Sequence, residues 1–83
     1  MLASFDNLVR SIVDDVAALR INYNDITPEQ TLVTVKAAPR DMGRLIGREG
    51  KVANSLRVII SAVGFKEHEG KKRYLLEITN DKI

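Results

Sequence analysis

Apolar side chains recur at helical spacing in the first part of the chain. They occupy one face of a helix in the i, i+3, i+4, i+7 pattern, at Phe5, Leu8, Val9, Ile12, Val13 and Val16. This pattern predicts a helix over residues 5–20. Ser4 is its expected N-cap, and Asp6 suits the positive end of the helix dipole.

Two strand-like segments follow. Leu19, Ile21 and Tyr23 alternate with polar residues, and residues 31–37 are rich in β-branched side chains. Between them, residues 25–30 have turn chemistry, with Pro28 suited to the second position of a turn. We therefore expect strands over residues 19–24 and 31–37, joined as a hairpin.

The second half of the chain predicts two helices and one strand. Pro39 fits the first position of a helix over residues 40–46. The segment 47–50 interrupts it, and a second helix runs from Lys51 to Val63, with Gly64 just beyond its end. Residues 65–72 are polar and read as a loop. Residues 73–79 alternate as a third strand, and residues 80–83 are expected to fray.

The order of these elements predicts the fold class. The second and third strands are separated by a helical crossover of residues 38–72, which suits a parallel pair and a right-handed connection. We expect a single domain over residues 1–83, an α+β two-layer sandwich of order α-β-β-α-α-β. Its three-stranded mixed sheet has the helices on one face.

Composition excludes several classes of function. The chain has 83 residues, no cysteine and one histidine, His68. Disulfides, thiolate zinc sites, a cysteine nucleophile and a multi-histidine metal site are therefore excluded, and no cofactor is expected. No signal peptide or membrane-spanning run is expected, so we predict a cytoplasmic protein with no membrane partner.

Basic residues concentrate in the second half of the chain. The net charge is +2, but residues 1–38 carry three basic and five acidic side chains, whereas residues 39–83 carry ten and six. An anionic partner would therefore bind the second half. Within it, Gly47 and Gly50 stand three apart between two short helices, with Arg44, Arg48 and Lys51 around them.

A glycine pair between helices is most often only a helix stop and a turn. Here the second glycine also opens a helix, whose N-terminal N–H groups favour a phosphate. The segment Leu45-Ile46-Gly47-Arg48-Glu49-Gly50 resembles the I-G-x-x-G signature of KH domains, which clamp about four nucleotides of single-stranded RNA with this loop.

The wider resemblance covers nearly the whole chain and is of the type II, bacterial kind. Residues 33–58, with the lead-in Ala38-Pro39-Arg40-Asp41-Met42-Gly43, resemble the KhpA-like family of small stand-alone KH proteins. This resemblance implies a cytoplasmic RNA chaperone that pairs with KhpB, a larger KH-domain protein, or with itself as a homodimer. It also implies a link to cell-length and envelope regulation.

The resemblance also assigns site residues. The loop Gly47, Arg48, Glu49 and Gly50 would hold the sugar–phosphate backbone, with Arg44, Ile46, Lys51 and Val52 flanking the groove. The third strand and residues 65–72 would form the other wall, so the basic residues Lys71 and Lys72 are candidate phosphate contacts as well as candidate solvated charges.

Two positions depart from the KH pattern. Ala53 stands where many KH domains have a bulky aliphatic residue, so Val52 and Leu56 are expected to supply the apolar floor of the groove. Glu49 places an anion in the phosphate clamp, which should lower the affinity for RNA.

Other residues have simpler interpretations. Tyr23 and Tyr74 are expected to pack across the sheet, Phe65 to pack in its loop, and His68 to be solvated. Val58 falls off the core face of its helix and hints at a protein contact.

The sequence favours one of three classes of function. A non-catalytic module that binds single-stranded RNA is favoured. A KH-fold protein-interaction module, with RNA contact secondary, is the alternative. An enzyme is not expected, because neither a dinucleotide-binding G-x-G-x-x-G nor a P-loop is present.

Overall fold

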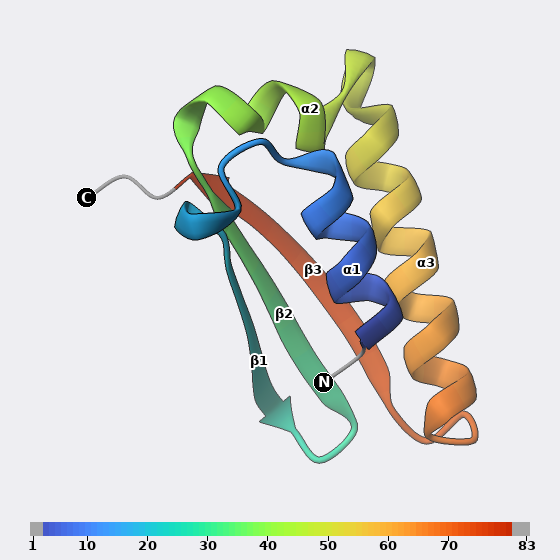
Figure 1. Cartoon of the computed structure of the whole chain (residues 1–83). Helices are drawn as coiled ribbons and strands as arrows, with labels where there is room; N and C mark the ends of the chain where they lie inside the picture. The colour runs from blue at the N-terminus through green and yellow to red at the C-terminus, as the bar shows by residue number, and fades with distance from the viewer. Residues whose placement is uncertain (1–2, 81–83) are drawn as a thin grey trace.

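Helices cover one face of a three-stranded sheet (Figure 1). The computed structural model describes residues 3–80. Its main elements are α1 (Ala3–Ile12), β1 (Arg20–Thr27), β2 (Gln30–Ala37), α2 (Met42–Ile46), α3 (Lys51–Glu67) and β3 (Arg73–Asn80). Short 3-10 turns span Val16–Ala18, Pro39–Asp41 and Arg48–Gly50. The predicted α+β sandwich of order α-β-β-α-α-β is confirmed.

The sheet is mixed, in the order β1-β2-β3. β1 and β2 pair antiparallel, with Tyr23 opposite Val33, and β2 pairs parallel with β3, with Val33 opposite Leu76. The crossover between the parallel strands carries α2 and α3, as expected. It brings α2 and the start of α3 to one end of the sheet.

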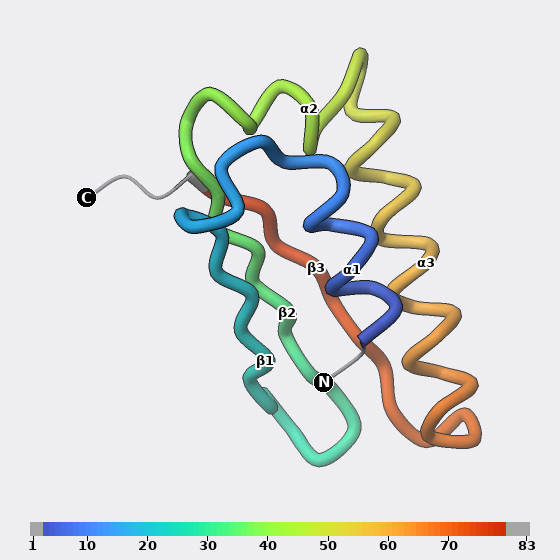
Figure 2. Tube along the Cα trace, in the orientation of Figure 1, coloured from blue at the N-terminus to red at the C-terminus, as the bar shows by residue number. Residues whose placement is uncertain are grey.

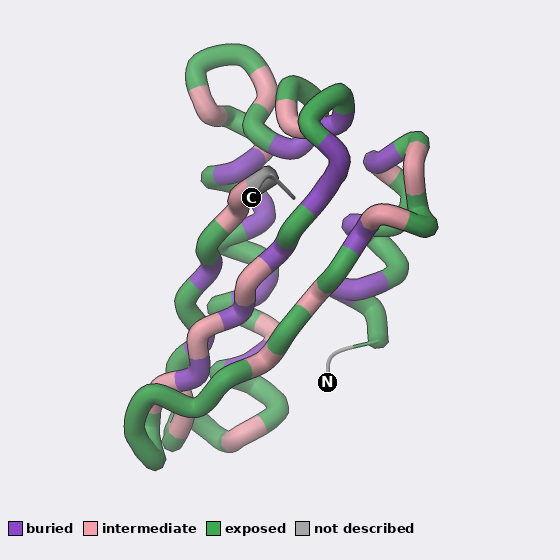
Figure 3. Tube along the Cα trace, turned by 90° about the vertical axis from the view of Figure 1, so that its left-hand side faces the viewer, coloured by how far each residue is buried: buried purple, intermediate pink, exposed green. Residues whose placement is uncertain are grey.

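Alternation along β2 separates the two faces of the sheet. Thr31, Val33, Val35 and Ala37 are buried under the helices, whereas the residues between them are more exposed (Figure 3). The helices add apolar side chains to the same core. The largest apolar side chains that are almost fully buried are Phe5, Val9, Leu45, Leu56 and Ile60.

The first helix is shorter than the predicted span of residues 5–20. It begins at Ala3, so Ser4 lies inside its first turn and is not the N-cap, and it ends at Ile12. The backbone N–H groups of Asp14 and Asp15 donate instead to the Asp41 carboxylate, at 3.0 and 3.1 Å. The chain therefore leaves the helix there, and Val16 is 47% exposed.

The hairpin is tighter than predicted. β1 extends to Thr27 rather than residue 24, and β2 begins at Gln30, so the turn is Pro28-Glu29 alone. Cross-strand hydrogen bonding therefore overrides the turn chemistry of residues 25–27. The crossover helix over residues 40–46 is also split, because Pro39–Asp41 form a 3-10 turn before α2.

Gly64 lies inside α3 rather than after its end, and the helix continues to Glu67. The reason is close packing of α3 on β3. A Cβ atom at Gly64 would lie 2.1 Å from Cδ1 of the Tyr74 ring. Glycine at this position therefore allows the approach of helix and strand.

Aromatic rings link β1, β3 and the residue that follows α3. Tyr74 meets Tyr23 edge to face, at 6.1 Å between ring centroids, which confirms their predicted packing. His68 is half-buried rather than solvated, because its ring stacks on Tyr74 and its Nε2 shares a hydrogen bond of 2.9 Å with the Tyr74 hydroxyl.

Candidate functional site

The glycine loop forms the turn between α2 and α3. Gly47 has φ +75°, and a Cβ there would lie 2.5 Å from Cγ2 of Val52, so no larger residue fits without a shift. Gly50 also has φ +75°, at the start of α3. Glu49 takes a left-handed conformation, φ 56° and ψ 27°, which is uncommon for a residue other than glycine. The loop is therefore built for a fixed, tight backbone turn.

Positive side chains lie at this loop. Arg48 and Lys51 are exposed, as is Glu49, while Gly47, Gly50 and Val52 are half-buried and Ile46 is 41% exposed. The turn thus presents its backbone and two cations to solvent, with one carboxylate between them. An anion that contacts the backbone here would meet both cations.

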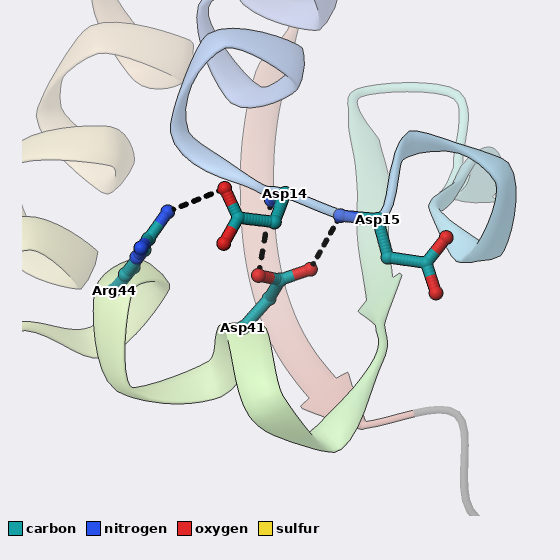
Figure 4. A network of polar contacts seen from close by, with 4 residues as sticks. All are labelled: Asp14, Asp15, Asp41 and Arg44. Carbon is teal, nitrogen blue, oxygen red and sulfur yellow. Dashed lines mark hydrogen bonds and ion pairs between the residues drawn. The ribbon is translucent and has the colours of Figure 1, made fainter.

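Arg44 points away from the loop, toward the end of α1. Its Nη1 lies 2.8 Å from Oδ1 of Asp14, and both side chains are 57% exposed (Figure 4). An exposed ion pair of this kind is weak, so Arg44 can exchange partners. Among the predicted site residues at this end of the molecule, Arg44 is the one paired with a carboxylate.

Asp41 is buried beside this pair, at 1% exposure. The N–H groups of Asp14 and Asp15 hold the pKa of its carboxyl below the ordinary value of 3.8. The carboxylate is therefore charged at neutral pH although it is out of contact with water.

A groove of about 670 Å³ runs between the outer side of α3 and β3. Its lining combines apolar side chains with two arginines, and consists of Arg57, Val58, Ser61, Ala62, Phe65, Arg73, Tyr74 and Leu75. The Ser61 hydroxyl donates to the Tyr74 carbonyl at 3.3 Å and links the two walls. An extended polymer with apolar rings and a charged backbone would fit such a lining.

The third strand and residues 65–72 were expected as one wall of the RNA groove; Arg73, Tyr74 and Leu75 of β3 line the groove seen here, but of residues 65–72 only Phe65 does, and its α3 wall was not predicted. Val52 and Leu56 were expected as its floor. Neither lines this groove: Leu56 is 2% exposed in the core and Val52 packs under Gly47, and both border a separate apolar hollow with Lys51 between α1 and α3. The missed signal is the spacing of Arg57, Ser61 and Phe65, four residues apart on one face of a helix.

Lys71 and Lys72 belong to the segment that follows Glu67, at the opposite end of α3 from the glycine loop, where Figure 2 shows the chain turning into β3. The 17 residues of α3 separate the two ends by about 25 Å. Lys72 Nζ is 3.1 Å from Oδ1 of Asp25, and the Thr31 hydroxyl and Lys72 together lower the pKa of that carboxyl. The structure therefore does not bring these two lysines together with the loop.

Phe65 lies on α3 rather than in a loop, and it is 53% exposed in the groove. Its ring packs beside Gly70, where a Cβ would lie 3.0 Å from Cζ. Val58 is 68% exposed, which agrees with its predicted place off the core face.

Residues 3–80 show no sign of a metal site or a membrane-spanning helix. These residues contain no cluster of three or more His, Asp or Glu side chains that could hold a metal ion. None of the helices among them is long and apolar enough to cross a membrane.

Comparison with known proteins agrees with this geometry. Residues 5–78 match the KH domain family of KhpA and KhpB. The chain is 35% identical to the RNA-binding protein KhpA of Caldanaerobacter subterraneus over 86% of this chain and 89% of the relative. It is 34% identical to the protein of the same name from Clostridium acetobutylicum, over 88% and 92%.

A third relative gives the same result. The RNA-binding protein KhpA of Aquifex aeolicus is 34% identical, over 83% of this chain and 82% of the relative. No solved structure was found to match. The relatives are named for RNA binding and not for catalysis, in agreement with the expectation that the domain is non-catalytic. The chain belongs to the KhpA/KhpB family of KH domains.

Proposed function

We propose that this chain binds single-stranded RNA without catalysis, gripping about four nucleotides. The observation that carries the proposal is the loop of residues 47–50, in which a Cβ at Gly50 would meet no atom within 4 Å, so the backbone is open beside exposed Arg48 and Lys51. Such a loop lets a sugar–phosphate backbone approach closely, as KH loops do.

The groove between α3 and β3 begins at Arg57 and shares no lining residue with the loop, but RNA that runs from the loop along α3 would reach it. Bases that leave the loop would lie against its apolar lining, at Val58, Ala62 and Leu75, while Arg57 and Arg73 face the backbone. Lys71 remains a candidate phosphate contact at the far end of α3. Lys72 would contact a phosphate while also paired with Asp25. Phe65 is the aromatic side chain placed to stack on a base in this groove.

A double substitution in the loop tests the proposal. Arg48→Asp with Glu49→Asp replaces one cation by an anion next to the phosphates, so the affinity for a short unstructured RNA should fall at least tenfold, about 1.4 kcal/mol. Lys36→Asp makes the same change of charge on the exposed face of β2 and is the control. Fluorescence anisotropy measures both variants, with circular dichroism to verify folding.

Equal losses of affinity in the two variants would mean that only net charge matters. An unchanged affinity in the loop variant would remove the loop from the site. Either result contradicts the proposal, whereas a loss confined to the loop variant supports it.

We further propose that the domain acts with a second KH domain, from another copy of itself or from a KhpB-type partner. A clamp for four nucleotides binds weakly, and a linked second site raises the effective concentration. Apolar side chains are exposed on the outer side of α1 and α3, at Leu8, Val58 and Ile59. The KhpA-like resemblance supports the same partner, a cytoplasmic RNA-chaperone role, and a part in cell-length and envelope regulation.

Leu8 on α1 tests assembly apart from RNA binding. It lines a shallow apolar hollow whose α3 side includes Ile59 but also Lys51 and Val52 beside the loop, and Val58 lines the groove. Leu8→Asp, on the α1 side of the hollow, should therefore abolish self-association or capture of a KH partner while RNA affinity per site stays within about threefold. Ile26→Asp, at the exposed hairpin, is the control. A strict monomer at ~100 μM in light scattering, together with no KH partner in pull-downs, would contradict assembly; this concentration exceeds a micromolar Kd.

A further inference from the structure

The helix that leads into the glycine loop cannot hold its own position. α2 has five residues, Met42–Ile46, and helices this short are unstable in isolation. Leu45 is fully enclosed in the core, and Met42, partly buried, packs against the same core. These two side chains stand three residues apart on one face of a single helical turn, so they fix where α2 lies more firmly than its direction.

Asp41 supplies a further, polar anchor at the start of α2. It immediately precedes α2 and stands four residues before Leu45, about one helical turn away. Aspartate at that position ordinarily caps its own helix, yet the Asp41 side chain makes no such bond. Both of its oxygens accept hydrogen bonds from the segment that follows α1 (Figure 4).

The exposed ion pair cannot replace this anchor. Arg44 and Asp14 also join α2 to the same segment, but both side chains are more than half exposed, where an ion pair contributes little. The carboxylate of Asp41 is 1% exposed and accepts hydrogen bonds from two backbone N–H groups that donate to no helical carbonyl. Of the polar contacts that hold α2, the one made by Asp41 therefore contributes most to the direction of the helix.

The direction of α2 sets the position of the glycine loop. The Gly47 N–H donates to the Gly43 carbonyl at 2.9 Å, so the hydrogen-bond pattern of α2 continues into the first glycine of the loop. A rotation of α2 would move Gly47 against Val52, where there is no spare room. It would also displace Arg48.

We propose that Asp41 is a positioning residue for RNA: it fixes the direction of α2 and so places the loop backbone and Arg48 against a phosphate. This inference rests on the proposed function. The chemistry requires a carboxylate, because two acceptor oxygens face two N–H donors. An amide at position 41 offers one acceptor, and its NH2 group would face an N–H.

The test compares Asp41→Asn with Thr31→Val. Thr31 is also a buried polar residue, at 2% exposure, and its hydroxyl donates to Asp25 at 2.7 Å near the hairpin, far from the loop. Binding of a short unstructured RNA is measured over a series of salt concentrations, at a temperature where circular dichroism shows every variant folded.

Asp41→Asn should lower the affinity at least fivefold. It should also reduce the slope of log K against log salt by roughly 0.7, the value for one lost phosphate contact on a single strand. Thr31→Val should change the affinity less than twofold and leave the slope unchanged. A purely structural role would lower the folded fraction but would not change the slope.

The outcomes separate this inference from the proposed function. If Asp41→Asn is folded and binds with the wild-type affinity and slope, while the loop double variant loses binding, Asp41 does not position the loop. If the loop double variant binds RNA normally, the proposed function fails first.

Hydrogen exchange in the wild-type protein gives a second measurement in case Asp41→Asn does not fold. The amide protons of Asp14, Asp15 and Gly47 should exchange through one shared opening, with protection factors that agree within about threefold. A Gly47 amide that exchanges freely while those of Asp14 and Asp15 stay protected would overturn the inference.

Discussion

Replacing Gly64 by alanine should destabilise the protein even though alanine is the better helix former. The new methyl group would lie 2.1 Å from Cδ1 and 2.7 Å from Cε1 of Tyr74. Carbon atoms pack at about 3.5–4.0 Å, so the ring or the helix must move by more than 1 Å, on the order of the shortfall in contact distance. The ring has little freedom, because it is 6% exposed and held between His68 and Tyr23.

The size of the effect follows from two opposing contributions. Overpacking of a fixed core site costs about 1–3 kcal/mol, and the upper end applies where the neighbour cannot yield. Alanine in place of glycine inside a helix returns about 1 kcal/mol. We therefore expect a net loss of about 2 kcal/mol, or a Tm lower by about 8–16 °C for a domain of this size.

Gly43→Ala is the matched control. Gly43 is helical as well, but a Cβ there meets no atom within 4 Å. This variant should be as stable as the wild type or more stable by up to about 1 kcal/mol. Urea denaturation followed by circular dichroism measures both variants. Equal or greater stability of Gly64→Ala relative to Gly43→Ala would refute the packing argument.

Three further outcomes are expected. Glu49→Lys changes the loop charge by two units and should tighten RNA binding at low salt. The slope of log K against log salt should become steeper by roughly 0.7 per added phosphate contact. Parallel lines with equal affinities in a salt titration would mean that Glu49 points away from RNA. Gly47→Ala places a methyl group 2.5 Å from Cγ2 of Val52 at φ +75°, so it should lower both the stability of the fold and the affinity for RNA. Anisotropy measurements on folded protein should show an affinity loss of at least tenfold. Wild-type affinity would show that RNA binding does not need this turn. The pKa values of Asp41 and Asp25 are lowered from 3.8 in the folded protein, so their stabilisation is complete above about pH 5 and is lost as the pH falls through the lowered values. Urea denaturation from about pH 5 to about pH 2 should therefore show a flatter acid limb for Asp41→Asn, and identical limbs would contradict the assignment.

Local patterns predicted the strands and the glycine loop because both depend on neighbours in sequence. Alternation in residues 31–37 sets which side of β2 is buried, and the spacing of Gly47 and Gly50 marks the turn. The end of α1 was predicted too late, because it is decided by the carboxylate of Asp41, more than twenty residues away. Helix periodicity cannot register such a contact.

The extent of α3 and the groove beside it depend on tertiary contacts as well. A glycine at the end of an apolar pattern reads as a stop, but Gly64 is in the helix because Tyr74 packs against it. The rotation of α3 then decides that Arg57 and Ser61 face β3. The predicted place of residues 65–72 on a wall of the groove made Lys71 and Lys72 candidates, but only the fold shows that they lie at the far end of α3.

The parallel pairing of β2 with β3 determines when the proposed binding surface comes into existence. The hairpin of β1 and β2 closes through a turn of two residues, whereas β3 can pair with β2 only after the crossover of residues 38–72 has been laid down. Contacts of such high sequence separation form late and slowly. Because β3 is one wall of the groove, a nascent chain would carry the glycine loop before it could bind RNA fully. The domain would gain its affinity at the last step of folding during synthesis.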